Sequence, residues 1–348
     1  MLKMKFLTLC VLILTTHSAA ESINYIGGDH YNPRSNKFFN PKIPKFDKGL
    51  WDVLKWLASR DQADWPKWVE NEAEPKLPST LSDHEMALTF INHSSFLIQF
   101  NGINILTDPI YSERTSPVSW AGPKRVRAPG LPFNRLPKID IVTISHNHYD
   151  HLDIETLLKL NKKFKPKFIV PMGDKKLLND IGIKNVEELD WWTSTNYLGD
   201  KLKITFTPAQ HFSGRGIFDR MRSLWGGYVF RFNGYQVFFA GDTGYASHFK
   251  EIKYRFEHID FALIPIGAYK PRWFMKPMHV NPNEAVKAHI DLGSKKSIGM
   301  HFGTFQLSDE AIYKPVEDLQ RAKTEYGIKP NDFNIMSVGE TLQHAFGL

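Results

Sequence analysis

Four side chains of the kinds that bind metal ions are concentrated in a six-residue segment near the middle of the chain. Neutral imidazole and carboxylate are the ligands that zinc takes where thiolate is absent. A helix or a strand would point these four side chains in different directions, so we expect the segment to be a loop. So short a loop suits two adjacent metal ions better than one, and we disfavour solvated loop histidines as the alternative. The four residues are His146, His148, Asp150 and His151.

A site for two metal ions needs more ligands, and three further candidates each close a predicted strand. Alone, a single buried histidine is more often structural than metal-binding, but these three positions at strand ends favour a shared site. The three are His211 after Leu202–Pro208, Asp242 after Val237–Gly241, and His301 after Ser297–Met300.

The elements that must position these residues alternate between strands and helices from Met86 onward. Asn101-Gly102 and Asn233-Gly234 are strong hairpin signals. We therefore expect paired strands at Met86–Phe100 with Ile103–Leu106, and at Tyr228–Phe232 with Gln236–Ala240. Further strands are expected at Ile139–Ile144, Lys201–Phe206, Phe261–Ile266 and Ser297–Met300.

Helical spacing of apolar residues predicts helices at Leu50–Leu57, Ile154–Asn161, Lys175–Ile181 and Asn283–Leu292. The last is framed by Asn281 as N-cap, Pro282 at the first helical position, Glu284 at the capping-box position and Gly293 beyond its end. Hairpins mixed with strand–helix units favour an α/β fold of two sheets with helices outside.

The composition is that of an ordinary globular protein. The 348 residues are 42% hydrophobic and 23% charged, which excludes a disordered chain, a collagen and a coiled coil. The only cysteine, Cys10, excludes an intrachain disulfide and a cysteine-based zinc site. A net charge of +7 permits an anionic partner without choosing among lipid, membrane and nucleic acid.

Residues 1–20 are typical of a secretory signal peptide. Lys3 and Lys5 precede the apolar run Phe6–Leu14, which is too short to span a bilayer, and Ser18-Ala19-Ala20 offers small residues for cleavage. A membrane anchor is the less favoured alternative. We expect an exported protein, periplasmic or secreted.

Residues 21–80 form an N-terminal arm in which aromatic residues and lysines interleave. This pattern suits a membrane interface. An amphipathic helix at Leu50–Leu57 that packs on the core, with solvated lysines, explains it equally well. No known nucleic-acid module is present, so we expect no nucleic-acid partner. The catalytic domain is predicted to be 81–348.

The ligand pattern resembles that of the metallo-β-lactamase superfamily, whose members bind two metal ions. The resemblance implies an αββα sandwich with the metal ions at the edge of the two sheets. It implies that the first metal ion takes His146, His148 and His211, that the second takes Asp150, His151 and His301, and that Asp242 bridges them.

A denser resemblance, from about Phe39 to the C-terminus, is to the N-acylphosphatidylethanolamine-hydrolysing phospholipase D family. The motifs are Leu106–Tyr111, Gly122–Arg125, Ser145–Asp153, Glu188–Trp192, Phe239–Tyr245, Ile264–Met275 and His301–Phe305. The resemblance implies two zinc ions per chain, membrane association, and release of an N-acylethanolamine from the phospholipid to leave phosphatidic acid. His279 and Tyr149 match family positions that contact the substrate. The segment Phe212–Ser223 and Gln306 depart from the animal members.

Roles for four residues follow from this chemistry. Asp150 has a spare carboxylate oxygen that could orient the attacking water. His279 would donate to a phosphate oxygen or help protonate the leaving alkoxide, with a structural histidine an equal alternative. Asp108 follows a strand and is expected to hold a ligand histidine by its other ring nitrogen. His93 is a further candidate for such a role, with a buried structural histidine slightly favoured.

The predicted function is zinc-dependent hydrolysis of N-acylphosphatidylethanolamine to N-acylethanolamine and phosphatidic acid. Another binuclear hydrolase, such as a sugar-phosphate lactonase or a general phosphodiesterase, is the alternative enzyme. A lipid-binding protein with a structural metal site is the alternative outside enzymes. The partners expected are a phospholipid substrate and a membrane surface, with peripheral attachment, and a homodimer is left open.

Overall fold

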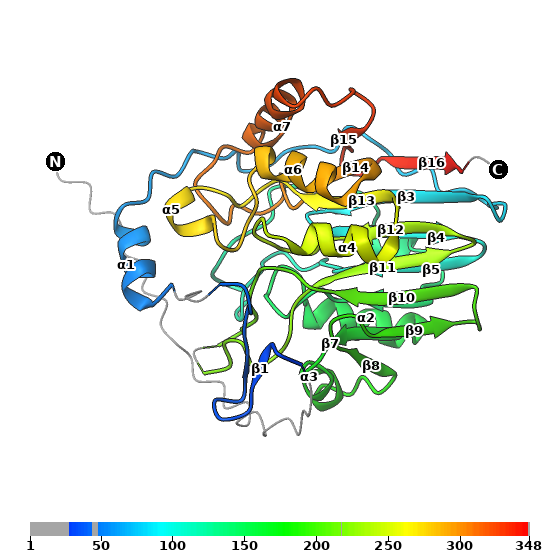
Figure 1. The fold of residues 1–348 in the computed structure, drawn as a ribbon, viewed down its shortest axis with the longest axis horizontal. Coiled ribbons are helices and arrows are strands. Elements are labelled where there is room, and N and C mark those ends of the chain that lie inside the picture. The colour runs from blue at the N-terminus through cyan, green and yellow to red at the C-terminus, as the bar shows by residue number, and fades with distance from the viewer. Residues whose placement is uncertain (1–27, 44–47, 217, 347–348) are drawn as a thin grey trace.

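The chain folds into two mixed sheets that pack face to face, with helices on their outer faces (Figure 1). The computed structural model describes residues 28–43, 48–216 and 218–346. The described residues form two seven-stranded sheets and a small two-stranded one. This confirms the αββα sandwich that the family resemblance implies. The predicted signal peptide, residues 1–20, lies outside the described residues.

The first large sheet contains, in spatial order, β15 (Phe333–Ile335), β14 (Ser294–Met300), β13 (Ile259–Pro265), β12 (Tyr235–Phe239), β11 (Gly227–Phe232), β10 (Leu202–Thr207) and β9 (Ser194–Tyr197). The second contains β16 (Thr341–Ala345), β3 (Glu85–Asn92), β4 (Ser95–Phe100), β5 (Ile103–Thr107), β6 (Ile141–Thr143), β7 (Lys167–Pro171) and β8 (Val186–Leu189).

The helices are α1 (Leu50–Ala58), α2 (Ile154–Phe164), α3 (Lys175–Asp180), α4 (His248–Phe256), α5 (Arg272–Met275), α6 (Pro282–Leu292) and α7 (Lys314–Glu325). Leu157 and Leu160 of α2 pack on Val142 and Phe168 of the second sheet. On the other side of the sandwich, α6 packs on β13 and β14. The helices therefore close the outer faces that the sheets would otherwise expose.

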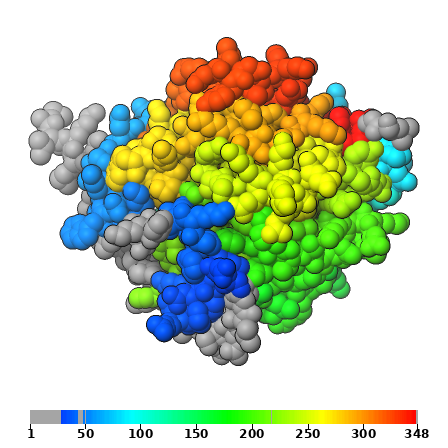
Figure 2. Space-filling model, in the orientation of Figure 1, coloured from blue at the N-terminus to red at the C-terminus, as the bar shows by residue number. Residues whose placement is uncertain are grey.

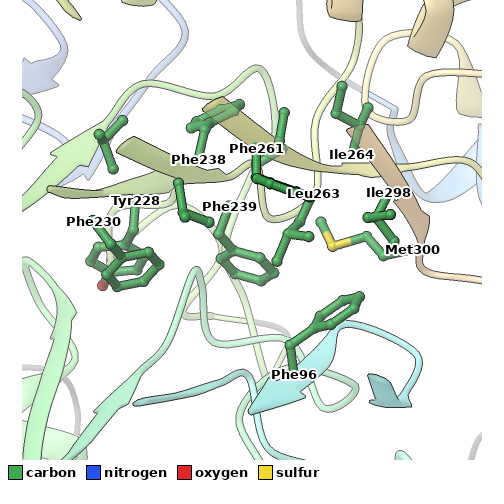
Figure 3. Close-up of a cluster of buried hydrophobic side chains, with 14 of the residues drawn as sticks. Phe96, Tyr228, Phe230, Phe238, Phe239, Phe261, Leu263, Ile264, Ile298 and Met300 are labelled. Carbon is green, nitrogen blue, oxygen red and sulfur yellow. The ribbon is translucent and has the colours of Figure 1, made fainter. Parts of the chain in front are cut away.

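The main core lies between the two sheets. Phe96 of the second sheet points toward Phe239, Leu263 and Met300 of the first (Figure 3). Phe100 stacks on Phe232 across the same interface, with their ring centroids 3.8 Å apart. Both layers are tied together by this apolar packing, so the edge where their strands end is held in a fixed position.

The structure confirms the helix at α6 in detail. The Asn281 side chain accepts a hydrogen bond from the backbone N–H of Glu284, and the Glu284 carboxylate accepts one from the backbone N–H of Asn281. Pro282 is the first helical residue, and Gly293 ends the helix at φ 59°. Both Asn-Gly hairpins are also confirmed, because β4 pairs with β5 and β11 with β12 around them.

The prediction of one strand at Met86–Phe100 was wrong. The chain turns back after Asn92, so that β3 and β4 form an antiparallel pair with Phe90 opposite Phe96. His93 makes this turn at φ 47°, a left-handed conformation that is uncommon outside glycine. The continuous apolar character of the segment hides the turn, because both strands are buried from Met86 onward.

The N-terminal arm lies on the surface of the sandwich (Figure 2). The described part of the arm includes a two-stranded hairpin of β1 (Tyr31–Asn32) and β2 (Lys37–Phe38). Phe38 is buried in the main core, and its backbone N–H donates to the carbonyl of Met221. The arm is thus packed against the catalytic part of the chain rather than separate from it.

Candidate metal centre

The carboxyl ends of several strands meet at one edge of the sandwich. Because β10 and β12 are both antiparallel to β11, they run in the same direction, and β12, β13 and β14 are parallel. His211, Asp242 and His301 follow β10, β12 and β14, so topology places all three at this edge. The loop Ser145–His151 follows β6 of the other sheet.

Glycine allows the two sheets to approach closely here. Gly241, at φ 60°, directly precedes Asp242, and a Cβ on it would lie 2.7 Å from the Cβ of Ser145 and 2.7 Å from the carbonyl oxygen of Gly226. A side chain at this position would therefore push the Asp242 turn away from the His-rich loop.

Three histidines form the first ligand group. His148 Nδ1 lies 2.8 Å from His146 Nε2 and 3.3 Å from His211 Nε2. One ring nitrogen from each of the three lies within 4.8 Å of the other two, a spacing that one metal ion could bridge. The backbone carbonyl of His211 is fixed by the buried Asn40 of the N-terminal arm, whose side-chain amide donates to it at 2.9 Å.

The second ligand group is built around the carboxylate of Asp150. Its Oδ2 lies 3.1 Å from His93 Nε2, 3.3 Å from His151 Nε2 and 3.4 Å from His301 Nε2. The three histidines are buried, whereas Asp150 is partly open to solvent. This group therefore meets water or a substrate from the side of Asp150.

Asp242 lies between the two groups. Its Oδ2 is 4.0 Å from His146 Nε2 and 3.2 Å from His151 Nε2, while its Oδ1 is 3.1 Å from His301 Nε2. A residue in contact with both groups is what a bridging ligand requires. The seven predicted ligands are thus brought together by the fold.

The outer ring nitrogens of three ligand histidines are already engaged, which leaves their inner nitrogens as electron-pair donors. His211 Nδ1 donates to the Met278 carbonyl at 2.9 Å, and His151 Nδ1 donates to Asp108 at 2.6 Å. His146 Nδ1 lies 2.9 Å from the hydroxyl of Ser145, which itself donates to Asp108. Asp108 thus makes the contact expected of a residue that orients a ligand.

Some buried polar atoms in the site lie close to oppositely charged groups but make no hydrogen bond of good geometry. Among the described residues, no hydrogen bond is made by Nε2 of His151, Nε2 of His301 or Oδ1 of Asp242. Leaving such atoms without a partner costs about 1–3 kcal/mol each. A bound cation would satisfy all three, so the residues present fit a metal ion.

The charges lead to the same conclusion. Burial by itself would raise the pKa of Asp242, but His151 and His301 outweigh it and hold that pKa well below its usual value. Burial lowers the pKa of His146 and of His211 well below the usual value, so these two rings are neutral. Burial would also lower the pKa of His301, but Asp242 and Asp150 raise it to about 9. The buried carboxylates of Asp150 and Asp242 are therefore stabilised by nearby positive charge, which either protons on the histidines or metal ions can supply.

His93 and His279 occupy different places around the centre. The His93 ring lies 3.9 Å from that of His301 between centroids, and its carbonyl accepts from the backbone N–H of His301. His279 stands at the rim, half-buried, with Nδ1 3.8 Å from Asp242 Oδ2. Burial lowers the pKa of His279 to about 4, so its imidazole is neutral.

Comparison with known families agrees with this geometry. Residues 103–302 match the family described as the beta-lactamase superfamily domain. The chain is 36% identical over 272 residues to N-acyl-phosphatidylethanolamine-hydrolyzing phospholipase D 1 of Caenorhabditis elegans, covering 74% of this chain and 76% of that protein. The chain belongs to the N-acylphosphatidylethanolamine-hydrolysing phospholipase D family, within the metallo-β-lactamase superfamily.

The chain is also similar to one further protein in sequence and to one solved structure in fold. An uncharacterized protein of Mycobacterium tuberculosis is 39% identical over 312 residues, covering 87% of this chain and 82% of that protein. The isothiocyanate hydrolase from Delia radicum gut bacteria has the same fold, with a TM-score of 0.60 at 20% identity, over 75% of this chain and 99% of that one. Membership of the N-acylphosphatidylethanolamine-hydrolysing phospholipase D family makes this chain a metal-binding hydrolase of phosphodiesters.

The structure shows the partners of Tyr149, a predicted substrate contact, and of Gln306, which departs from the animal members of the family. The Tyr149 hydroxyl donates to the backbone carbonyl of Arg215 at 2.8 Å, so the contact found for Tyr149 is with the protein, and its role in substrate binding stays a prediction. Gln306 donates to the carbonyl of Ala63 in the N-terminal arm.

Sequence analysis missed residues that support the ligand loop. Asn147 stands between two ligands, and its side chain bonds Asp174, Ser223 and the backbone N–H of Gly214. Arg215 also contacts this loop. Their only signal in the sequence is position, since Asn147 lies inside the His-rich segment and Arg215 follows His211 by four residues.

Proposed function

We propose that this enzyme is a zinc-dependent phospholipase D that hydrolyses N-acylphosphatidylethanolamine to N-acylethanolamine and phosphatidic acid. The observation that carries the proposal is the pair of ligand groups joined by Asp242, with Asp150 and His279 on the open side. The similarity to the Caenorhabditis elegans protein named for this reaction supports the choice of substrate.

In this proposal two zinc ions are held by the residues at the centre. The first ion would take His146, His148 and His211, the second Asp150, His151 and His301, and Asp242 would serve both. When bound, such ions polarise phosphoryl oxygens and lower the pKa of water to about 7.

Asp150 is the residue suited to direct the attacking water. Burial would raise the pKa of Asp150, but its neighbours His151, His301 and His93 hold it well below the usual value. It is therefore a carboxylate at neutral pH and accepts a hydrogen bond from water. Because it is also partly open to solvent, it can direct that water toward the substrate phosphorus.

His279 is the residue suited to hold the phosphate. A neutral imidazole at the rim can donate its N–H to a phosphoryl oxygen, and this donor becomes more valuable as charge builds up in the transition state. Arg272 donates to the His279 carbonyl at 2.9 Å and to the Glu284 carboxylate at 2.7 Å, so the rim position is fixed.

Mass spectrometry of reaction products tests the proposal. Purified protein should convert N-acylphosphatidylethanolamine into N-acylethanolamine and phosphatidic acid, and a chelator should stop the reaction. Turnover only of a sugar-phosphate lactone or of a generic phosphodiester would overturn the substrate assignment in favour of another binuclear hydrolase. Lipid binding without turnover would reject the reaction itself.

We also propose that α1 and α5 form a membrane-contact patch beside the centre. In α1, Trp51 is 83% exposed and Leu57 is 52% exposed, and neighbouring Trp273 of α5 is 40% exposed. Lys48 and Lys55 lie over the Trp273 ring, 5.4 Å and 5.1 Å from its centroid. Exposed aromatic residues beside lysines suit the interface of an anionic bilayer. In the part of the chain that the structure describes, no helix has the length and apolar character needed to cross a membrane.

The other face of α1 packs on the protein. Trp56 stacks on Phe274 with ring centroids 5.0 Å apart, and its Nε1 donates to Asp309 at 3.2 Å. The helix thus has one docked face and one exposed face, and Figure 1 shows it lying next to α5. Core packing therefore accounts for Trp56, and membrane contact is proposed only for the exposed face that carries Trp51.

Trp51→Ser and Trp56→Ser form a matched pair for this proposal. We expect Trp51→Ser to weaken binding to phosphatidylethanolamine–phosphatidylglycerol vesicles about 10-fold, since burying a large apolar side chain contributes about 1.5–3 kcal/mol. Cleavage of a short-chain soluble diester and the melting temperature should stay at the wild-type level. Trp56→Ser should instead lower the melting temperature. Unchanged vesicle binding in Trp51→Ser would remove α1 from the membrane contact.

A further inference from the structure

The segment between β10 and β11 folds back onto the ligand loop. Ser213 and Ser223, near its two ends, are joined by a hydrogen bond from the Ser213 hydroxyl to the Ser223 carbonyl. The backbone N–H of Gly214 donates to the side chain of Asn147 at 2.8 Å. The segment is therefore anchored at its base and touches the ligand loop directly.

Arg215, in this segment, reaches across the ligand loop. Its Nη1 donates to the carbonyl of Asn147 at 2.9 Å and to the carbonyl of Leu152 at 2.8 Å. These two carbonyls lie before and after the ligands His148, Asp150 and His151. One guanidinium nitrogen thus joins the two ends of the stretch that supplies ligands to both groups.

Tyr149, inside that stretch, adds two contacts with the same arginine. The Arg215 guanidinium carbon lies 4.0 Å from the centroid of the Tyr149 ring, and the Tyr149 hydroxyl donates to the Arg215 carbonyl. The backbone N–H of Arg215 is held in turn by the Asp219 carboxylate at 3.0 Å. Arginine and tyrosine therefore hold each other, and the arginine is fixed from behind.

We propose that Arg215 is a positioning residue, which with Tyr149 clamps the ligand loop in the conformation that binds metal. The inference rests on the proposed metal centre, and it assigns to Arg215 an effect on metal affinity. The Arg215 side chain contacts two backbone carbonyls and one aromatic ring of the stretch Asn147–Leu152. These contacts restrict the conformational freedom of the ligand loop before metal binds. Less ordering entropy is then lost on binding.

Only arginine supplies this combination of contacts. A planar guanidinium can stack on the tyrosine ring and donate in its own plane to two carbonyls at once. Lysine retains the charge but is a point donor on a flexible stem. Arg215→Lys should therefore restore only part of the metal affinity that Arg215→Ala loses, whereas a role based on charge alone predicts full restoration.

Zn²⁺ titration of the metal-free protein tests the clamp. Metal is removed from the full chain by a chelator, and the dissociation constant is measured by competition with a chromophoric chelator. Loss of a residue that supports ligands typically weakens metal binding about 10–100-fold, and we expect this for Arg215→Ala. The absorption spectrum of the Co²⁺-loaded protein should change with it, because the ligand geometry relaxes. Arg255→Ala is the matched control. Arg255 lies on α4, away from the ligand loop, and its guanidinium carbon is 4.2 Å from the centroid of the Trp192 ring.

Each result decides between the alternatives. A wild-type dissociation constant and Co²⁺ spectrum in Arg215→Ala would overturn the clamp, whereas absence of Zn²⁺ binding by the wild-type protein would instead reject the proposed metal centre. Tyr149→Phe removes a single hydroxyl and serves if Arg215→Ala does not fold. A weaker Zn²⁺ affinity in Tyr149→Phe supports the clamp. An unchanged Zn²⁺ affinity with a raised KM for the lipid would contradict it and assign the hydroxyl to substrate.

Discussion

Replacing Asp150 with asparagine is expected to leave the fold intact and to lower kcat on the order of 10³-fold or more. The amide has nearly the same shape, but it carries no negative charge. Among the described residues, the Asp150 carboxylate is the only group that contacts His93, His151 and His301 together. Its Oδ2 lies 3.1–3.4 Å from Nε2 of each of these histidines. In the proposed mechanism, its loss would remove both the charge that holds the second metal ion and the acceptor that orients water.

The measurement is steady-state turnover of N-acylphosphatidylethanolamine, accompanied by thermal unfolding. Asp291→Asn is a suitable control, because that carboxylate accepts a hydrogen bond from the Tyr245 hydroxyl outside the site. Turnover within a factor of a few of the wild-type value in Asp150→Asn would remove Asp150 from the role assigned to it.

Replacing His211 or His301 with alanine is expected to abolish activity and to remove metal at the same time. The two residues lie in different ligand groups, one near His146 and His148 and the other near Asp150 and His151. If each group holds its own ion, elemental analysis should show about two zinc equivalents in the wild type and about one in each variant. The remaining ion should differ between the two variants.

His258→Ala provides the control for this pair, because His258 is a partly exposed histidine whose Nε2 lies 3.5 Å from Asp260 Oδ2, outside both ligand groups. It should keep the full metal content and activity. Active wild-type protein that contains one metal ion or none would contradict the two-ion assignment, whatever the variants show.

The convergence of the candidate metal ligands could be predicted from the sequence, because strand ends determine where these residues lie. His211, Asp242 and His301 follow strands that run in the same direction in one sheet, so their convergence depends on topology and hardly on side-chain detail. Asp108 could be predicted for the same reason, since β5 runs parallel to β6. The cap of α6 and the two Asn-Gly turns could also be predicted, because each depends on residues that are close together in the sequence.

Features that depend on long-range packing could not be predicted in this way. The turn at His93 is invisible in the uninterrupted apolar run of β3 and β4, although it brings His93 into the site. Helical spacing predicted α1, but the difference between Trp51 and Trp56 arises from Phe274 and Asp309, which lie more than 200 residues away. Arg215 belongs to a segment without regular structure, so no periodicity marks its contacts with Asn147 and Leu152.

The bond that is broken provides the most direct test of the account. Water directed by Asp150 toward a phosphoryl group held by His279 must leave its oxygen on the phosphate-containing product. Hydrolysis of N-acylphosphatidylethanolamine in oxygen-18 water should therefore give labelled phosphatidic acid and unlabelled N-acylethanolamine by mass spectrometry. Label in the N-acylethanolamine would show attack at carbon, and release of a free fatty acid would show cleavage of an acyl bond. Either result would contradict the mechanism proposed for this site.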